Sequence, residues 1–356
     1  MTARTKTTSC IIVSPETMGQ EHHLEKLLET EKLARSLNIE PFFVVKFKLK
    51  NINRKHLVSK QILDYLKYSA AELNFPLLIF TCELSASWQR EIEKYLCSKV
   101  IDRTELILDI FSDRARSHEG KLQVKLAQLN HMATRLVKIW THLERQKGGI
   151  GLRGGPGEKQ IETDRRIIRE NINRIQKRLA KVKKTRQQNR SYRKRNNVPV
   201  VALVGYTNVG KSTLFNLLTK KNILVKNMPF ASLDTTTGKV YLNNSNSCIL
   251  VDTVGFIEEL PKELISAFRS TLEELNDADL ILHVLDATDE NLSYRRNCVN
   301  ETLAQILTKQ IPILEVYNKS ELSSTTVGAR QIKISALEQL GIENLKENIA
   351  SSLNQH

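Results

Sequence analysis

The segment that most constrains this chain is residues 205–213, G-Y-T-N-V-G-K-S-T, which lies between two apolar runs. The run before it, 200–204, predicts a strand, and the run after it, 214–218, predicts a helix. The spacing G-x-x-x-x-G-K-S is that of a loop that wraps phosphate groups, because glycines let successive backbone N–H groups point inward. The chain is therefore predicted to bind a nucleoside triphosphate, with a chance glycine turn before a helix as the alternative.

Each part of this loop has a predicted task. The Lys211 ammonium reaches the β- and γ-phosphates and is predicted to be catalytic, while the Ser212 hydroxyl binds magnesium. The helix that follows adds its N-terminal N–H groups and its dipole. The nucleotide-binding residues predicted here are Gly205, Tyr206, Thr207, Asn208, Val209, Gly210, Lys211, Ser212 and Thr213.

A second motif follows the next strand-like run. Residues 248–251 are apolar and lead into Asp252, Thr253, Val254 and Gly255, a D-x-x-G motif. In nucleotide hydrolases the aspartate holds magnesium through water, and the glycine N–H meets the γ-phosphate. We therefore predict Asp252 and Gly255 as catalytic residues, and the whole motif as part of the nucleotide site.

Two later motifs identify the base. An N-K-x-acid motif follows the apolar run 313–317, and an S-A-x motif follows the apolar run 332–334. Together they resemble the guanine-reading pair of GTPases, in which the acid accepts from the N1–H and the exocyclic amine of guanine. Adenine lacks this pair of donors, so the site selects GTP. The predicted base contacts are Asn318, Lys319, Ser320, Glu321, Ser335, Ala336 and Leu337.

Two positions depart from the usual GTPase pattern. Glu321 stands where aspartate is usual, one methylene longer, so we expect base selection to survive with lower affinity. Phe256 stands where Ras-like enzymes have the glutamine that orients the attacking water. Because phenylalanine cannot orient water, we expect slow intrinsic hydrolysis that depends on a partner. A plain core aromatic is the other interpretation of Phe256, and the two are compatible.

The first switch segment should lie within residues 219–239, where Pro229-Phe230 is followed by several hydroxyl side chains. Aligned on this Pro-Phe pair, Ser232 takes the position of the usual magnesium-ligating threonine, so it is predicted as a metal ligand and a catalytic residue. Thr236 is the other candidate for this ligand. The nucleotide contacts predicted in this segment are Phe230, Ala231, Ser232, Leu233 and Asp234.

The positive charge of the chain is concentrated in one segment. The formal net charge of the 356 residues is +15, and residues 171–197 hold eleven Lys and Arg side chains and no acid. A solvated helix face is one explanation of such a run. Its density and single sign favour a polyanionic partner, and RNA is the obvious candidate.

The composition argues against several other classes. No apolar run approaches the ~18 residues of a membrane span. The N-terminus is basic but lacks the apolar core of a signal peptide. The five cysteines form no C-x-x-C pair, which argues against a disulfide framework and against a zinc site. A cytoplasmic protein is the default expectation.

Two apolar seams flank a glycine-rich segment. They consist of Leu122, Leu126, Leu129, Ala133, Leu136, Trp140 and Leu143 on one helix, and of Ile168, Ile172, Ile175, Leu179 and Val182 on the next. Between them, residues 148–157 hold six of the fourteen glycines of the chain. Two such helices joined by a short breaker should fold back as an antiparallel hairpin. Its tip is either a bland flexible loop or, with Arg153 in a glycine frame, a surface for close approach to RNA.

The first hundred residues alternate between strand-like and helix-like patterns. Strands are predicted at 11–13, 42–47, 77–80 and 106–111, and helices at about 21–37, 55–72 and 86–98. This alternation predicts a small parallel sheet. No glycine-rich phosphate loop occurs here, so docking or bracing is the expected task.

Several longer segments resemble the central signature of the HflX family of GTPases. They are residues 102–111, 114–115, 119–124, 148–157, 158–166 and the D-T-V-G-F at 252–256. The resemblance covers about residues 100–340, whereas at 56–61 the sequence H-L-V-S-K-Q replaces the Y-I-G-K-G-K-like stretch of many members. It implies binding to the large ribosomal subunit in the GTP state, separation of stalled or hibernating ribosomes, and a hairpin tip directed toward the peptidyl transferase centre.

We therefore expect an α/β protein of three parts. Residues 1–112 form a small α/β sheet domain, residues 113–196 a long, basic, antiparallel helical hairpin with a glycine-rich tip, and residues 197–356 a P-loop GTPase domain. The last has a mostly parallel sheet with helices on both faces. The expected protein is a cytoplasmic, monomeric, magnesium-dependent GTPase that contacts the large ribosomal subunit through 148–197 and acts in ribosome splitting, rescue or subunit biogenesis. A GTP-dependent RNA-binding adaptor without significant catalysis and a tRNA-modification-type GTPase are the alternatives.

Overall fold

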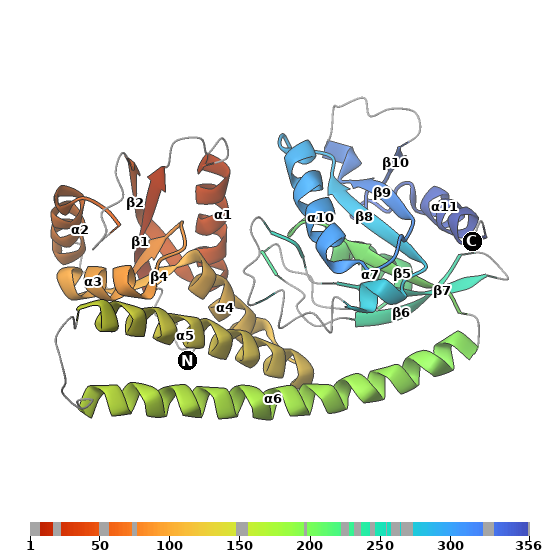
Figure 1. The fold of residues 1–356 in the computed structure, drawn as a ribbon. Helices are drawn as coiled ribbons and strands as arrows, with labels where there is room; N and C mark the ends of the chain where they lie inside the picture. Colours follow the sequence, from red (N-terminus) through yellow and green to blue (C-terminus); the bar gives the residue numbers. More distant parts are fainter. Residues whose placement is uncertain are drawn as a thin grey trace, which may run out of the picture. The chain divides into compact units, whose positions relative to one another are not determined.

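The computed structural model is shown in Figure 1. It describes residues 8–16, 23–49, 57–72, 77–146, 156–195, 198–221, 228–230, 236–242, 246–253, 255–257, 264, 273–322 and 331–354. Side chains are described throughout these ranges except at 8, 136–146, 156–161, 183 and 185–195.

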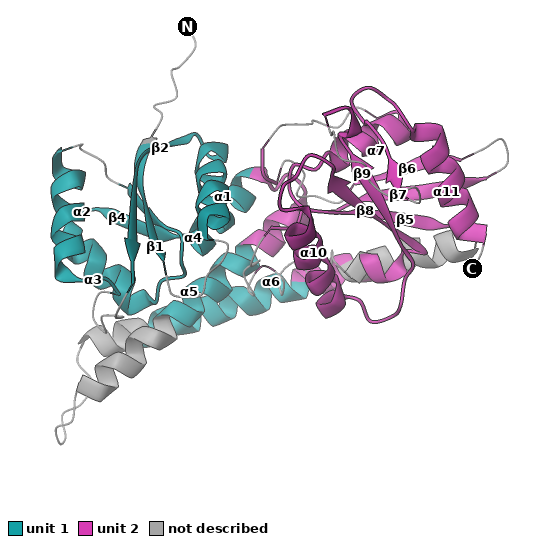
Figure 2. Ribbon diagram, turned by 90° about the horizontal axis from the view of Figure 1, so that it is seen from above, with its two compact units in different colours: residues 1–113, 125–177 teal, residues 114–124, 178–356 magenta. Residues whose placement is uncertain are grey.

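The chain divides into two compact units (Figure 2). One comprises Met1–Asp113 and Lys125–Lys177, and the other Arg114–Val124 and Arg178–His356. The predicted three-part division at residues 112 and 196 stays a prediction.

The first unit contains a four-stranded parallel sheet in the order β2-β1-β3-β4. Its strands are β1 (Thr8–Glu16), β2 (Ile39–Lys48), β3 (Leu77–Phe80) and β4 (Lys99–Asp102). Its first helices are α1 (His23–Ser36), α2 (Lys60–Glu72), α3 (Ala86–Leu96) and α4 (Arg103–Arg114). All four residues of β3 are buried, as expected for a strand covered on both faces. The predicted parallel sheet is thus present.

The predicted strand at 106–111 is wrong, because these residues lie in α4. The fourth strand is β4, one segment earlier, and Asp102 at its end caps the helix by accepting from the Glu105 N–H at 2.9 Å. Five of the six residues of the run are buried. An apolar run this short does not separate a buried helix from a buried strand.

The two seamed helices are α5 (His118–Gln146) and α6 (Pro156–Arg195). Within the first unit they run alongside each other in opposite directions (Figures 1 and 2). The seam residues Leu122, Leu126, Leu129, Ile168 and Ile175 are buried. Ala133, Ile172, Leu179 and Val182 are half-buried. The other three seam side chains, and the glycine-rich tip up to residue 155, lie outside the described residues.

The second unit contains a six-stranded sheet in the order β10-β9-β8-β5-β7-β6. Its strands are β5 (Val200–Val204), β6 (Thr236–Tyr241), β7 (Ser247–Asp252), β8 (Leu280–Asp286), β9 (Ile313–Asn318) and β10 (Ile332–Lys333). Only β6 is antiparallel to its neighbour. The helices α7 (Lys211–Thr219), α10 (Leu292–Ile306) and α11 (Ile342–Asn354) pack against these strands. Two short 3₁₀ turns, η1 (Glu273–Asp277) and η2 (Ser320–Leu322), are also described.

The described part of the chain contains neither a membrane-spanning helix nor a disulfide. None of its helices is long and apolar enough to cross a membrane. All five cysteines lie in this part and are free; Cys10 and Cys248 are buried, whereas Cys97 is exposed.

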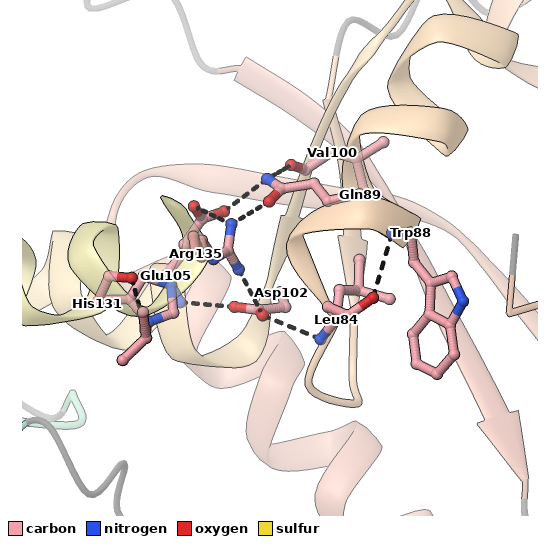
Figure 3. Close-up of polar contacts among 10 residues, drawn as sticks. Leu84, Trp88, Gln89, Val100, Asp102, Glu105, His131 and Arg135 are labelled. Carbon is pink, nitrogen blue, oxygen red and sulfur yellow. Dashed lines mark hydrogen bonds and ion pairs between the residues drawn. The ribbon is translucent and has the colours of Figure 1, made fainter. Parts of the chain in front are cut away.

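A buried polar network fastens α5 to the sheet of the first unit (Figure 3). Arg135 donates to Asp102 Oδ2 at 2.8 Å and to Glu105 Oε1 at 2.7 Å. Gln89 Nε2 donates to the other oxygen of Glu105 at 3.0 Å and to the Val100 carbonyl at 2.6 Å. Asp102 is fully buried, so its charge depends on these partners.

The pKa of Glu105 in this network is raised to about 7, chiefly because burial penalises its charged form; Arg135 acts in the opposite direction. The folded state therefore holds the Glu105 proton more tightly than the unfolded chain. The contribution of Glu105 to the free energy of unfolding is fully present at low pH and is lost as the pH rises through about 7.

We expect Glu105→Gln to become more stable relative to the parent as the pH rises, because the amide carries no buried charge. The difference in free energy of unfolding should change by at most ~1.4 kcal/mol per pH unit. Urea unfolding at pH 5.5 and 8.0 measures it, followed by Trp88 fluorescence in a Trp140→Phe background. The same substitution at exposed Glu83 is the control, and an equal pH effect in both variants would contradict the prediction.

Candidate nucleotide-binding site

The loop 205–210 joins the carboxyl end of β5 to the first residue of α7. Gly210 precedes the helix with a φ of 94°, and a Cβ built there would lie 2.3 Å from the Asn318 amide nitrogen. A side chain is thus excluded at this position by conformation and by space. Thr213 lies in the first turn of α7 and is half-buried.

Lys211 is buried, and its ammonium faces the phosphate loop from inside. Nζ donates to the Gly205 carbonyl at 2.9 Å and to the Tyr206 carbonyl at 2.6 Å. An ammonium has three donors, so it retains capacity for a phosphate oxygen. Burial lowers the pKa of Lys211 to about 8, while the Asp252 carboxylate acts in the opposite direction.

Ser212 and Asp252 meet from two different elements. The Ser212 hydroxyl, on α7, donates to Asp252 Oδ2 at 2.9 Å at the end of β7. The next residue, Thr253, donates its hydroxyl to the Leu203 carbonyl at 2.6 Å and so ties this end of β7 to β5. A hydroxyl and a carboxylate are the hard oxygen donors that magnesium prefers, and magnesium on a nucleotide needs only one or two protein ligands. The residues present therefore fit this ion.

In the described ranges, no group of three or more His, Cys, Asp or Glu side chains is arranged so that it could hold a metal ion. A metal held by the protein alone thus has no candidate site there. The Ser212–Asp252 pair instead suits an ion that arrives with phosphate groups.

Gly255 and Phe256 lie directly against the phosphate loop. A Cβ on Gly255 would lie 2.9 Å from Thr207 Cγ2 and 3.2 Å from Lys211 Nζ. The Phe256 N–H donates to the Gly205 carbonyl at 3.1 Å, and the Thr207 N–H donates to the Phe256 carbonyl at 2.8 Å. The Phe256 side chain is 2% exposed, so it is a core aromatic at the position where a glutamine would orient water.

Asn318, at the end of β9, connects the base motif with the phosphate loop. Its Nδ2 donates to the Val209 carbonyl at 2.9 Å, and its Oδ1 accepts from the Ala336 N–H at 2.9 Å. The Ser335 hydroxyl accepts from the Glu338 N–H at 3.0 Å and so closes the turn of the S-A-x motif. Three segments that are distant in the sequence are thus joined through one buried amide.

The remaining base-motif residues lie around this amide. Lys319 pairs with Asp286 at 2.5 Å, and Ser320 and Glu321 lie in η2. The Glu321 side chain is exposed, and Leu337 is 75% exposed. A purine therefore has open access to this edge.

Asp286 was not among the site residues predicted from the sequence. It ends β8 directly opposite Asn318 in the parallel register, and its pKa is lowered although burial acts to raise it, because Lys319 and Thr288 donate to its carboxylate. A carboxylate at the end of an apolar run was the available signal, as at Asp252.

The first switch segment is described in part, at residues 219–221, 228–230 and 236–239. Phe230 is buried and has a φ of 55°, an uncommon conformation for a bulky residue. Thr236 begins β6 opposite Asp252. Ala231, Ser232, Leu233 and Asp234 lie outside the described residues, as does Val254. The choice between Ser232 and Thr236 as magnesium ligand therefore stays open.

Comparison with known proteins gives consistent matches along the chain. Family models described as GTP-binding GTPase N-terminal, GTP-binding GTPase Middle Region and 50S ribosome-binding GTPase match residues 24–112, 114–193 and 200–319. GTPase HflX of Escherichia coli (strain K12) is 46% identical over 307 residues, which are 85% of this chain and 71% of the relative. The chain belongs to the HflX family of GTPases.

Other members and one solved structure agree. GTPase HflX of Caldanaerobacter subterraneus subsp. tengcongensis is 43% identical over 96% of this chain and 79% of the relative. GTPase HflX of Spirochaeta thermophila is 36% identical over 98% of this chain and 86% of the relative. The crystal structure of SsGBP with GDP is similar over 98% of this chain and 99% of that one, with 26% identity and a TM-score of 0.52. This HflX-family chain is therefore a GTP hydrolase.

The lowered pKa of Lys211 predicts proton uptake when nucleotide binds at alkaline pH. Near pH 8 part of the free protein has a neutral Lys211, whereas bound phosphate favours the charged ammonium. Calorimetric binding of a non-hydrolysable GTP analogue at pH 8, in two buffers of different ionisation enthalpy, measures the uptake. Lys211→Arg, whose guanidinium stays charged, should bind without this uptake. Absence of uptake in the parent protein would contradict the assignment.

The space at Gly255 predicts a catalytic defect in Gly255→Ala. The added methyl must displace Thr207 and the Lys211 ammonium, and misplacement of this kind costs roughly 10- to 100-fold in rate. Single-turnover GTP hydrolysis measures the loss. Thr207→Ser removes the methyl that the new Cβ meets first, so the double variant should recover part of the rate. Hydrolysis at the parental rate in Gly255→Ala would show that this contact is unimportant.

Proposed function

We propose that this chain is a GTP-driven switch that binds the large ribosomal subunit and acts in splitting or rescue of stalled or hibernating ribosomes, or in subunit biogenesis. GTP hydrolysis follows from the family, and the family model that matches residues 200–319 is described as a 50S ribosome-binding GTPase. The observation that carries the proposal for this chain is a one-signed row of exposed cations on α6.

The row begins at Arg174 and follows one side of the helix. Its described members, Arg174, Lys177, Arg178, Lys181 and Lys184, are all exposed. Spacings of three and four residues place side chains on one face of a helix. No acid occurs in the sequence from 171 to 197. A long, uniformly positive face is suited to phosphate backbone, where binding releases counterions.

The catalytic residues act on GTP at the carboxyl edge of the sheet. Lys211 stabilises charge on the transferred phosphoryl group, and the Gly255 N–H contacts the γ-phosphate. Ser212 would hold magnesium directly, together with Ser232 or Thr236, and Asp252 would hold it through water. When bound, the ion neutralises negative charge on the phosphates.

The position after Gly255, where a glutamine would orient the attacking water, is occupied by Phe256, which is buried in the core. The structure thus supports slow intrinsic hydrolysis and stimulation by a bound partner. Cleavage then changes the two switch segments and, with them, the affinity for rRNA. A cytoplasmic, ribosome-associated monomer suits this role.

The test is GTP hydrolysis with and without purified large ribosomal subunits at 50 and 200 mM salt. We expect a large stimulation that falls steeply with salt, because each contact with a phosphate releases counterions and so makes binding depend on salt. A variant with Arg174, Lys177, Arg178 and Lys181 changed to Gln should keep its intrinsic rate and lose roughly tenfold or more of the stimulation.

The matched control removes the same charge elsewhere on exposed surface: Lys60, Lys99, Lys121 and Lys333 changed to Gln. This control should retain the stimulation. Equal loss in both variants would indicate a non-specific charge effect. Normal GTP binding without any stimulation would favour an RNA-binding adaptor or an RNA target other than the mature ribosome.

A further inference from the structure

We propose that Arg295 is a positioning residue for GTP hydrolysis and acts through the ring of Tyr206. Its guanidinium carbon lies 5.1 Å from the centroid of that ring. Tyr206 is the second residue of the phosphate loop, whereas Arg295 lies in α10, far along the chain. The inference rests on GTP hydrolysis and is independent of any ribosomal partner.

The guanidinium is also held by Asp289. Arg295 Nη1 and Asp289 Oδ2 are 2.7 Å apart, and their side chains are 32% and 10% exposed. Asp289 is itself fixed in the turn between β8 and α10, where its Oδ1 accepts from the Asn291 N–H at 3.1 Å. The carboxylate therefore fixes the guanidinium in place instead of leaving it mobile in solvent.

Tyr206 has two structural tasks in the nucleotide site. Its carbonyl accepts from Lys211 Nζ at 2.6 Å, so its position sets the position of the ammonium. Its backbone also forms a parallel bridge with Phe256, so it holds the residue that follows Gly255. A shift of Tyr206 would move the phosphoryl-stabilising cation and the γ-phosphate contact together.

A cation over an aromatic face is attracted to the ring quadrupole, and the attraction strengthens when the pair is partly desolvated. Tyr206 is 8% exposed, so the pair is partly desolvated. Asp289, Arg295 and Tyr206 thus form a chain of contacts from α10 to the catalytic ammonium. Arg295 contacts the Tyr206 ring and is assigned no contact with the nucleotide itself, so it is a positioning residue.

The experiment compares Arg295→Gln, Arg295→Lys and Arg296→Gln in intrinsic GTP hydrolysis without ribosomes. Arg296 is the matched control, because it is the neighbouring arginine of the same helix and pairs with Glu315 at 3.7 Å. We expect Arg295→Gln to lower kcat about two- to tenfold, with GDP affinity and the unfolding midpoint unchanged. Arg295→Lys keeps a cation over the ring and should recover most of the rate.

A double-mutant cycle with Tyr206→Leu then separates the proposed route from a general effect on α10. If Arg295 acts through the ring, Arg295→Gln should have no further effect in the Tyr206→Leu background. An additive loss in that background would overturn the inference, as would equal rates in the Arg295 and Arg296 variants. A parallel loss of GDP affinity and stability would show a merely structural role. Because no ribosome is present, failure here leaves the proposed ribosomal function untouched.

Discussion

The register of four parallel strands places the carboxylates and the amide of the candidate nucleotide site. β5 pairs with β7 and β8, and β8 pairs with β9, so Leu203 lies opposite Asp252 and Asp286 lies opposite Asn318. Successive side chains of a strand point to opposite faces, so a one-residue slip would turn Asp252 away from Ser212. Nearly all residues of β5 and β8 are buried, and this apolar core fixes the register. The position of these two carboxylates is therefore a consequence of hydrophobic packing.

Both units contain buried charges that depend on fixed partners. Lys211 faces two carbonyls of its own loop, and Arg135 faces Asp102 and Glu105. Such groups contribute little net stability, but loss of one partner leaves the other charge buried and uncompensated. In the first unit the network fixes α5 to the sheet. In the second unit, the two carbonyls fix the Lys211 ammonium, so that it can meet a phosphate without reorganisation.

The sequence predicts the phosphate loop well because its chemistry is local. Lys211 and Ser212 follow Gly210 in an unbroken pattern, and the strand and helix beside them have distinct periods. The run 106–111 was predicted wrongly, because a helix with several buried faces and a buried strand give the same apolar composition. Contacts such as that of Arg295 with Tyr206 depend on which strands and helices become neighbours. No local pattern specifies that order, so these contacts appear only in the folded chain.

Phe256 links the chemistry of the site to its core. Its ring is buried, and its backbone N–H and carbonyl are bonded to Gly205 and Thr207. Because both its side chain and its backbone are held, Phe256 cannot turn toward a water molecule as an exposed polar side chain does. A shift at Gly255 is instead passed through the next peptide to the phosphate loop and to the packed interior. This arrangement suits the proposed function, in which a partner surface orders the site and so sets the time of cleavage.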